Sequence, residues 1–383
     1  MNPGSLLVHG AALIDASGRR DNGWIHVADG TITATATGDD WRGLAADADR
    51  VIDAAGKVVT PGFIDLHCHG GGGVAYSDED PATALAFHRA HGTTRTLLSL
   101  VSAPIDRQAE WLARIAAVAA EDPLVLGSHL EGPYLATQRC GAHDPSVLVT
   151  PTAGSVERQL AAARGTLAMV TIAPELDGAD DAIRTFRDAG AVVALGHTDA
   201  DYDTTRRAFD SGATVLTHAF NAMAPLLHRS PGPVMAGVDA GATLELIVDG
   251  VHVHPAVAAG LFRLAPGRVA LITDAIAAAG GASGSYRLGS STVEVRDGRA
   301  TLAGTSTLAG SVLTQDVALR LAVEQLHIDP VDAVAALTTV PARVLGRADL
   351  GRLQAGFRAD LLLLDASWSP TLVVADGQVL LAG

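Results

Sequence analysis

The sequence contains 383 residues and carries a formal net charge of −15, and 48% of its residues are hydrophobic. The length suits a large domain of roughly 250 residues with a smaller attachment, and the apolar content excludes disorder as a description of the whole. The acidic balance argues against nucleic acid or an anionic membrane as the main partner, because either requires a basic surface.

Cysteine content and the N-terminal segment bear on the compartment. Cys68 and Cys140 are the only cysteines, which is too few for a disulfide framework and fits a reducing environment. The N-terminal segment lacks the basic region and the long apolar run of a signal peptide, and no stretch of about 18 apolar residues occurs that could span a membrane. We therefore expect a cytoplasmic protein.

Both ends of the chain have the pattern of short β-strands. Runs rich in β-branched and aliphatic residues, two of them with an Asp-Gly turn inside, lie at residues 5–15, 24–37, 359–367 and 371–383. We expect residues 1–60 and 350–383 to form one small β-sandwich domain from both chain termini. A catalytic domain then spans residues 61–349.

The middle of the chain alternates between two kinds of segment. Eight apolar runs that end in small or polar residues lie at residues 62–69, 93–102, 124–133, 167–175, 191–200, 213–223, 243–254 and 268–280. Segments with helical character lie between them, and several end in glycine, as helices commonly do. This alternation predicts an α/β fold with a parallel sheet covered by helices. Eight such units favour a (β/α)8 TIM barrel over an open doubly wound sheet, and a hairpin-like insert at residues 285–304 follows the eighth run.

Histidines and carboxylates fall at the C-terminal ends of the strand candidates, where barrel enzymes place their active sites. His67 and His69 are two residues apart in the first candidate, a spacing that aims both rings to the same side of a strand. The others are Glu131, His197, His218, His252 and Asp274. One such histidine alone is typical of a hydrogen-bonded core residue, but buried ionisable groups are costly unless they are paired or metal-bound. Together they predict a site for Zn²⁺ or a related divalent metal.

The motifs at these positions resemble a known family. PGFIDLHCHG, at residues 61–70, is similar to the first-strand signature of the amidohydrolase superfamily. HLEGPYL, GAHDP, LGHTDA, THAFNAM, DGVHVHP, ITDAIAAAG and TLAGS, in family order, resemble the N-acetylglucosamine-6-phosphate deacetylases. Many superfamily members bridge two metals with a carboxylated lysine, which is excluded here because the only lysine, Lys57, precedes the first barrel strand. Glu131 on the third strand is the natural replacement.

The resemblance implies a metal centre. Glu131, His197 and His218 would bind the principal metal. Some family members have lost the histidine pair and use one metal, whereas this sequence keeps His67 and His69, so we expect one or two divalent metals per subunit. Zinc is the first expectation, with Fe, Mn, Co or Cd as alternatives.

The resemblance also implies the reaction, which is hydrolysis of the acetamide of N-acetylglucosamine 6-phosphate to glucosamine 6-phosphate and acetate, in amino-sugar catabolism or cell-wall sugar recycling. A bound cation lowers the pKa of its water towards about 7, so that this water can attack the carbonyl at neutral pH. Asp274 is expected to shuttle the proton to the leaving amine. His252 is expected to polarise the carbonyl and stabilise the oxyanion.

Further residues match substrate contacts of the family. The resemblance implies that Arg229 binds the phosphate, a role that suits the planar guanidinium fork. It also implies a homodimer in which the site lies near the interface and a neighbour contributes to the phosphate pocket. The other implied contacts are Ala142, His143, Asn221, Ala222, His252, Leu308, Ala309 and Gly310. Residues 134–145, which include Cys140, form a polar loop of the kind that acts as a lid.

Two other interpretations stay open. The first keeps the fold and changes the substrate, to that of a dihydroorotase-like enzyme or an N-acyl-amino-acid deacylase, and the missing bridging lysine and Arg229 count against it. The second is a catalytically silent metal-binding scaffold. Asp274 counts against this one, because a structural metal site needs no proton shuttle.

Overall fold

The computed structural model describes residues 4–78 and 80–382. The chain divides into two compact units. The first comprises Met1–Asp65, His88–Arg95 and Thr314–Gly383, and the second comprises Leu66–Phe87 and Thr96–Leu313. Every residue predicted for the functional site lies in the second unit. The domain boundaries at residues 60 and 350 stay a prediction.

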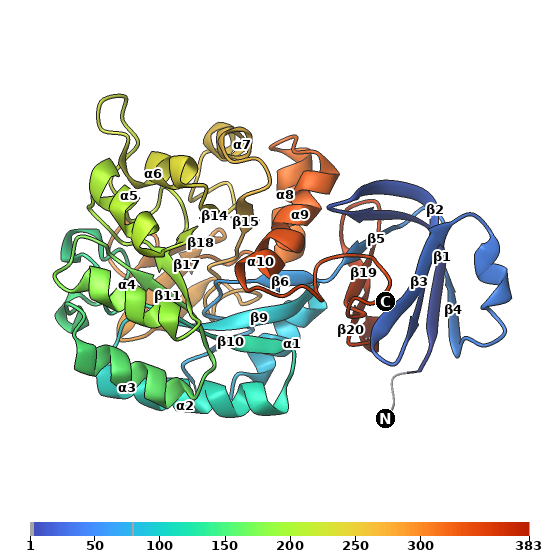
Figure 1. Cartoon of the computed structure of the whole chain (residues 1–383), viewed down its shortest axis with the longest axis horizontal. Coiled ribbons are helices and arrows are strands. Elements are labelled where there is room, and N and C mark those ends of the chain that lie inside the picture. The colour runs from blue at the N-terminus through green and yellow to red at the C-terminus, as the bar shows by residue number, and fades with distance from the viewer. Residues whose placement is uncertain (1–3, 79, 383) are drawn as a thin grey trace. The chain divides into compact units, whose positions relative to one another are not determined.

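The first unit contains a sheet made from both ends of the chain. Its strand order is β21-β20-β19-β5-β1-β2-β3, with β4 paired to β1, so that blue and red strands lie side by side in Figure 1. The strands are β1 (Leu6–Asp15), β2 (Gly18–Ala28), β3 (Thr31–Thr37), β4 (Arg50–Asp53), β5 (Val58–Pro61), β19 (Leu361–Leu364), β20 (Pro370–Ala375) and β21 (Gln378–Ala382), and a 3-10 helix spans Asp40–Gly43. Alternate side chains from both chain ends, such as Leu6, Val8, Leu361 and Leu363, share one core, as predicted for the small β domain.

A buried arginine links segments of this first unit. The Arg95 guanidinium donates to Asp360 over 2.6 and 3.0 Å and to Asp376 over 2.6 Å. Burial lowers the pKa of Arg95, but the two carboxylates raise it by more, so the pKa lies above its ordinary value and the group stays charged. Such a buried pair is strongly destabilising when only one partner is removed, and it therefore ties residues 88–95 to the C-terminal strands.

A barrel-like sheet of eight strands carries the predicted site. Its strand order, β6-β9-β10-β11-β12-β13-β14-β15, follows the chain, and neighbours from β9 onward pair in parallel. The strands are β6 (Phe63–Asp65), β9 (Thr93–Leu100), β10 (Val125–Glu131), β11 (Leu167–Ile172), β12 (Val192–Leu195), β13 (Val215–Leu216), β14 (Thr243–Leu246) and β15 (Val269–Leu271). The N–H of Asp274, after β15, donates to the carbonyl of His67, after β6, over 2.8 Å. The sheet is thus nearly closed into the predicted barrel, with one strand in each of the eight apolar runs.

Helices connect successive parallel strands, as this topology requires. These connecting helices are α1 (Ala82–Ala90), α2 (Ile105–Glu121), α3 (Ala153–Ala163), α4 (Ala179–Asp188), α5 (Tyr202–Ser211), α6 (Gly232–Ala240) and α7 (Pro255–Leu264). Three more helices follow the last barrel strand: α8 (Gln315–Glu324), α9 (Pro330–Leu337) and α10 (Thr339–Val344). In Figure 1, α2 to α5 lie on the outside of the barrel strands. The amphipathic pattern explains this placement, since α4 buries Ala182, Ile183 and Phe186 along one side. No helix within residues 4–78 and 80–382 is long and apolar enough to cross a bilayer.

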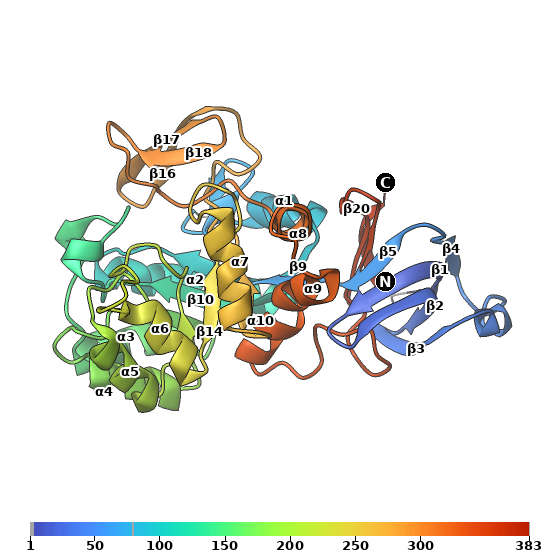
Figure 2. The ribbon, with the colours of Figure 1, turned by 90° about the horizontal axis from the view of Figure 1, so that it is seen from above.

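Several short elements and one insert lie outside the eight barrel strands. The insert is a three-stranded antiparallel sheet that stands off to one side in Figure 2. The short elements are β7 (Gly70–Gly71), β8 (Val74–Ala75), β16 (Gly284–Leu288), β17 (Ser291–Arg296), β18 (Arg299–Leu302) and the 3-10 turns Thr137–Arg139 and Pro145–Val147. Leu288 and Val293 of the insert share a core with Val101, after β9, and Ile276, after β15. The insert is therefore anchored at the C-terminal ends of the barrel strands.

Candidate metal centre

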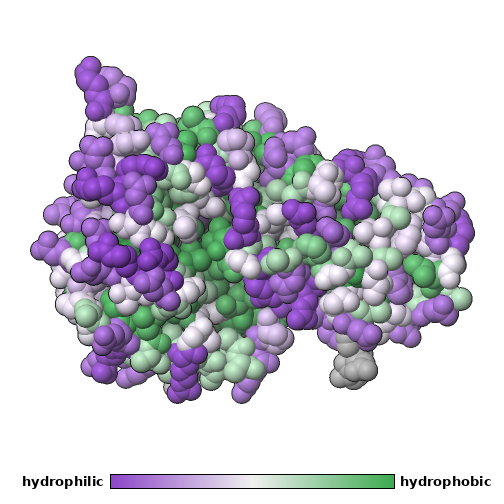
Figure 3. Space-filling model, viewed as in Figure 1, coloured by the Kyte–Doolittle hydropathy of each residue, from purple (hydrophilic) through white to green (hydrophobic). Residues whose placement is uncertain are grey.

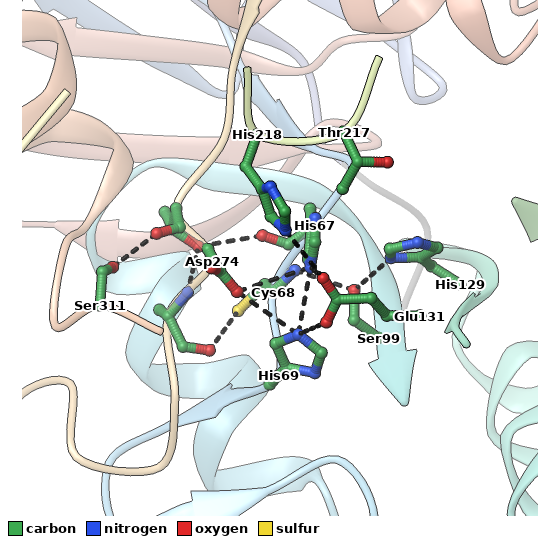
Figure 4. A network of polar contacts seen from close by, with 12 residues as sticks. His67, Cys68, His69, Ser99, His129, Glu131, Thr217, His218, Asp274 and Ser311 are labelled. Atoms are coloured by element: carbon green, nitrogen blue, oxygen red, sulfur yellow. Dashed lines mark hydrogen bonds and ion pairs between the residues drawn. The ribbon is translucent and has the colours of Figure 1, made fainter. Parts of the chain in front are cut away.

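The predicted ionisable residues gather at the C-terminal ends of the barrel strands. His67 and His69 follow β6, Glu131 ends β10, His197 and His218 lie two residues beyond β12 and β13, and Asp274 lies three residues beyond β15. Figure 4 shows His67, His69, His218, Glu131 and Asp274 pointing toward one another. The barrel brings these sequence-distant side chains into contact.

Three of these residues have a left-handed backbone. The φ angle is 47° at His197, 24° at His218 and 48° at Asp274. A non-glycine residue in this region costs on the order of 1 to 3 kcal/mol, and such residues cluster at functional sites. In each case the chain turns just beyond the strand, which leaves the side chain facing the cluster.

Glu131 is the centre of the cluster. Its Oε1 atom lies 3.0 Å from Nε2 of His197 and 3.0 Å from Nε2 of His218. Its Oε2 atom lies 3.1 Å from Nε2 of His69. One carboxylate therefore contacts histidines that follow three different strands, and both of its oxygens take part.

Hydrogen bonding fixes which nitrogen of His197 faces Glu131. Nδ1 lies 2.8 Å from the carbonyl oxygen of Arg139, so Nδ1 must donate. In the neutral ring Nε2 then carries only a lone pair, and it faces the Glu131 carboxylate and, at 3.1 Å, Nε2 of His218. Lone pairs that face each other at this distance require a proton or a cation between them. Two imidazoles and a carboxylate suit a divalent metal such as Zn²⁺, so these residues fit the predicted ion.

His143 has the opposite tautomer. The N–H of Ser102 donates to its Nδ1 atom over 3.1 Å, so the proton of the neutral ring lies on Nε2, which is 3.2 Å from Oε2 of Glu131. Burial lowers the pKa of His143 to about 4 and keeps the ring neutral at pH 7. Although Glu131, His143 and His197 are close enough to hold an ion, this tautomer makes His143 a hydrogen-bond donor. The geometry therefore favours His218 as the third ligand.

His67, His69 and Asp274 form a second group of potential ligands. Nε2 of His67 lies 3.1 Å from Nε2 of His69 and 3.5 Å from Oδ1 of Asp274. Nε2 of His69 lies 3.4 Å from the same Oδ1 atom. Because Glu131 contacts histidines of both groups, the residues also fit a second metal beside the first.

The carboxylates of the cluster are balanced by histidines. Among the described residues, every ion pair of Glu131 and Asp274 is with a histidine. Burial alone would raise the pKa of both acids, but His67 is the main group that lowers them, to well below the ordinary value for Glu131 and to about 2 for Asp274. Burial lowers the pKa of His67, yet Glu131 and then Asp274 raise it well above its ordinary value. The cluster therefore attracts positive charge.

His252 lies six residues beyond β14 rather than at the strand end, and Asp249 holds it there. Oδ1 of Asp249 accepts from the N–H groups of Val251 and His252 over 2.8 and 2.9 Å, and Oδ2 lies 2.7 Å from Nδ1 of His252. Asp249 thus fixes both the turn and the ring. The sequence reasoning did not single out Asp249, although an acid three residues before a histidine in DGVHVHP was the available signal.

A cavity of about 340 Å³ reaches the cluster, a size typical of a small-molecule site. Of the predicted residues, its lining contains His69, Glu131, Ala142, His143, His197, His218, Asn221, Ala222, His252, Asp274, Leu308 and Gly310. The structure therefore brings most of the predicted site together around one space.

Four predicted residues do not line this cavity. His67 and Ala309 are fully buried, and Cys140 is half-buried next to the lining residue Gly141. Arg229 is exposed on the loop between β13 and α6, which projects at the top left of Figure 1 and has a hydrophilic tip in Figure 3. Among the described residues of the lining, none is an arginine or a lysine.

The insert contributes one wall of the cavity, which the sequence reasoning missed. Leu288, Gly289 and Ser290, at the turn between β16 and β17, belong to the lining. Ser290 donates to Asp144 over 2.9 Å, so this wall contacts the loop predicted as a lid. The position of the hairpin, directly after the last barrel strand, was the only sequence signal for this role.

The predicted lid loop, residues 134–145, is coupled to a metal-ligand candidate. The N–H of Ala136 donates to the carbonyl of His197 over 2.9 Å, and the carbonyl of Arg139 accepts from the His197 ring. The Arg139 side chain pairs with Asp199 at 2.7 Å. A movement of this loop would therefore alter the orientation of His197.

The sequence matches the amidohydrolase family over residues 58–380. It is 37% identical over 375 residues to the N-acetylgalactosamine-6-phosphate deacetylase of Escherichia coli O157:H7, covering 96% of this chain and 97% of that one. It is 37% identical over 339 residues to the N-acetylglucosamine-6-phosphate deacetylase of Homo sapiens, covering 84% and 82%.

Solved structures with this architecture are also similar. The N-acetyl-D-glucosamine-6-phosphate deacetylase of Mycobacterium smegmatis, in complex with N-acetyl-D-glucosamine-6-phosphate, is 41% identical with a TM-score of 0.94 over 99% of this chain and 100% of that one. The N-acetylglucosamine-6-phosphate deacetylase of Pasteurella multocida is 26% identical with a TM-score of 0.93 over 98% and 99%. A β-aspartyl dipeptidase of Fervidobacterium islandicum, at 17% identity and a TM-score of 0.64, shares the fold alone.

Replacing Glu131 by glutamine should deplete the cluster of metal, because the amide keeps the shape but removes the charge that both histidine groups share. We expect metal affinity to fall by more than about 100-fold, beyond the loss caused by an outer hydrogen-bond partner. Metal per folded chain, measured by mass spectrometry after dialysis, tests this. Glu157→Gln, on the exposed side of α3, is the control. Wild-type metal content in Glu131→Gln would contradict the assignment.

Proposed function

The chain belongs to the amidohydrolase family, and on that premise we propose that it hydrolyses the acetamide of N-acetylglucosamine 6-phosphate to glucosamine 6-phosphate and acetate. Relatives over most of its length are deacetylases of amino-sugar phosphates, and a solved relative at 41% identity holds this compound. The observation that carries the proposal is the cavity, in which Glu131, His197, His218 and Asp274 face the same space as the implied sugar contacts.

The histidine groups would hold the metals. Glu131, His197 and His218 would bind the principal ion, and His67 and His69 a second one with Asp274. When bound, a divalent metal supplies Lewis acidity, which lowers the pKa of water towards about 7 and polarises a carbonyl. Zinc suits imidazole and carboxylate donors, with Fe, Mn, Co and Cd as alternatives for the same set.

Asp274 would transfer the proton. Its side chain lines the cavity and is 12% exposed, so one carboxylate oxygen can reach a water molecule there. A pKa of about 2, set against burial mainly by His67, keeps the carboxylate ionised and ready to accept a proton. It would then deliver this proton to the amide nitrogen, which is a very poor leaving group until it is protonated.

His252 would donate a hydrogen bond from Nε2 to the acyl oxygen. Nδ1 donates to Asp249, so the neutral ring has no proton on Nε2, and only the imidazolium donates from both nitrogens. Burial lowers the pKa of His252, but Asp249 and then Asp274 raise it overall, against a smaller opposing effect of Arg299. Asp249 thus favours the form that can stabilise an oxyanion.

The phosphate would be bound by the partner subunit's Arg229. This chain carries a net charge of −15 and lines its cavity with no arginine or lysine among the described residues, so a dianion needs a cation from elsewhere. Arg229 lies beside Leu226 and Leu227, which are 41% and 54% exposed. Exposed apolar side chains on a projecting loop are typical of a contact surface. A homodimer would cover them and bring each arginine to the other subunit's cavity.

N-acetylgalactosamine 6-phosphate is a second candidate substrate, because the E. coli relative that is named for it matches nearly the whole chain. The relatives favour neither a dihydroorotase-like enzyme, nor an N-acyl-amino-acid deacylase, nor a silent scaffold. A cytoplasmic location would suit the free cysteines Cys68 and Cys140, which fit a reducing compartment.

Acetate release tests the proposed substrate directly. We expect kcat/KM for N-acetylglucosamine 6-phosphate to exceed that for the unphosphorylated sugar by at least about 100-fold, because the unphosphorylated sugar cannot make the contacts of the phosphate group. The galactosamine epimer and an N-acetyl amino acid are the comparison substrates. Equal rates with and without phosphate would refute phosphate recognition, and a preference for the epimer would move the assignment to it.

Asp249→Asn should shift the basic limb of the pH profile to lower pH. Asparagine keeps one oxygen that can accept from the N–H groups of Val251 and His252, but its amide nitrogen cannot accept from Nδ1 of His252, and it lacks the charge that raises the pKa of His252. The imidazolium is present below that pKa and is lost as pH rises through it, so a lower pKa shortens the active range at high pH. We expect a shift of at least about one pH unit in kcat/KM. Asp239→Asn, at an exposed position on α6, is the control. If the basic limb of the pH profile does not move in Asp249→Asn, the proposed role of the imidazolium is wrong.

Mixed dimers test whether Arg229 acts across subunits. Alone, Asp274→Asn should lose activity by about 10²- to 10⁴-fold as a missing acid–base group, and Arg229→Ala should lose activity at low substrate concentration. In a heterodimer of the two, one site combines an intact Asp274 with the partner's Arg229. A statistical mixture should therefore regain about a quarter of wild-type activity. If heterodimers purified through two tags stay inactive, the arginine does not act in trans.

A further inference from the structure

Glu245 is a buried carboxylate that has no part in the proposed reaction. It lies on β14 and is 0% exposed. Its Oε1 atom has no hydrogen-bond partner among the described residues. A buried carboxylate is costly unless opposite charge or hydrogen bonds offset its lost hydration. Its presence in the barrel interior therefore calls for a physical reason.

The contacts of Glu245 lead to the metal-ligand candidates. Oε2 lies 3.3 Å from Nδ1 of His67, and the N–H of His218 donates to the same atom over 3.4 Å. The Glu245 carbonyl accepts from the N–H of Ala219 over 2.8 Å. His67 and His218 belong to different ligand groups, so Glu245 contacts both groups, through the ring of His67 and through the main chain of His218.

Glu245 decides which nitrogen of His67 carries a proton. An ionised carboxylate can only accept, so Nδ1 of His67 donates to it, and in the neutral ring Nε2 keeps its lone pair. That Nε2 faces His69 at 3.1 Å and Asp274 at 3.5 Å. The ring packs edge-on against His129, with centroids 4.5 Å apart, which limits its rotation. The lone pair is therefore aimed at the second ligand group.

Among the described residues, Glu245 is the only carboxylate on the outer nitrogen of a proposed histidine ligand. Nδ1 of His197 donates to an uncharged main-chain carbonyl. Nδ1 of His69 and Nδ1 of His218 have no hydrogen-bond partner among these residues. A carboxylate at this position makes the ring a stronger donor to a metal and fixes its tautomer.

The number of buried carboxylates is an independent argument for a second metal ion. Glu131, Asp274 and Glu245 together supply three negative charges, and all of their ion pairs among the described residues are with histidines. Glu131 and Asp274 alone match the charge of one divalent ion. With Glu245 added, the three carboxylates offset most of the positive charge of two divalent ions.

We propose that Glu245 is a positioning residue for a second metal: it keeps the proton of the neutral His67 ring on Nδ1, which leaves Nε2 for the ion, and it supplies the added negative charge that a second divalent ion needs. The inference rests on the proposed function only in that His67 and His69 bind a metal. The folded chain then binds two divalent ions rather than one.

Counting metal in Glu245→Gln tests this without reference to activity. Wild-type protein titrated with Zn²⁺ or Co²⁺ should take up two equivalents per folded chain. Glu245→Gln should retain the Glu131 site and lose affinity for the second ion by about 10- to 100-fold, to the same single equivalent as His67→Asn. Thr243→Val changes a buried polar residue two positions away on the same strand and face, and should keep two equivalents.

Two equivalents with wild-type affinity in Glu245→Gln, or a single equivalent in the wild type, would overturn the inference. A second measurement needs no variant: histidine ¹⁵N spectra of the Zn²⁺-loaded wild type should show His67 protonated at Nδ1, and protonation at Nε2 would overturn it equally. Metal counting tests the role of Glu245, whereas the acetate assay tests the proposed substrate, so either prediction can be wrong without the other. A wild type that binds two ions without releasing acetate would refute the substrate while leaving the role of Glu245 standing.

Discussion

The arrangement of this site depends on three buried carboxylates that have no arginine or lysine beside them. Glu131, Asp274 and Glu245 are all buried, and among the described residues their only ionic partners are histidines. A negative charge removed from water is stable only with positive charge in contact. The histidines must therefore aim nitrogens inward, where a proton or a metal completes the balance. The same demand explains why ligand candidates occupy strained positions such as φ 47° at His197.

The chemical role of each histidine is set by its outer hydrogen bond. A carbonyl on Nδ1 of His197 leaves Nε2 free to bind a metal, whereas the N–H of Ser102 on Nδ1 of His143 turns that ring into a donor. A carboxylate on Nδ1 distinguishes His67 and His252 from both. The outer hydrogen-bond partners thereby distinguish metal ligands, a hydrogen-bond donor and an imidazolium within one site.

Phosphate recognition places a different constraint on the molecule. The cavity of an acidic chain has no arginine or lysine in its described lining, while Arg229 is exposed on a projecting loop with two exposed leucines. In the proposed function, a second subunit supplies the missing charge. The insert and the loop at residues 134–145 meet at Asp144 and Ser290, so the cavity is walled by segments outside the barrel. In the proposed function, the substrate would therefore contact these attached segments as well as the barrel residues that carry the chemistry.

By itself the sequence determined the eight strands, their parallel order and the positions of the ionisable residues at strand ends, because apolar runs and the two-residue spacing of His67 and His69 are local properties. It also excluded a lysine bridge, since Lys57 lies before the barrel. It did not single out Glu245, which lies in the apolar run TLELIV. Only the tertiary structure decided which nitrogens face Glu131, that Asp249 holds His252, and that Arg229 lies away from this chain's cavity. Spacing along a strand fixes the side to which a residue points, whereas distances and tautomers depend on partners that barrel closure brings from other strands and loops.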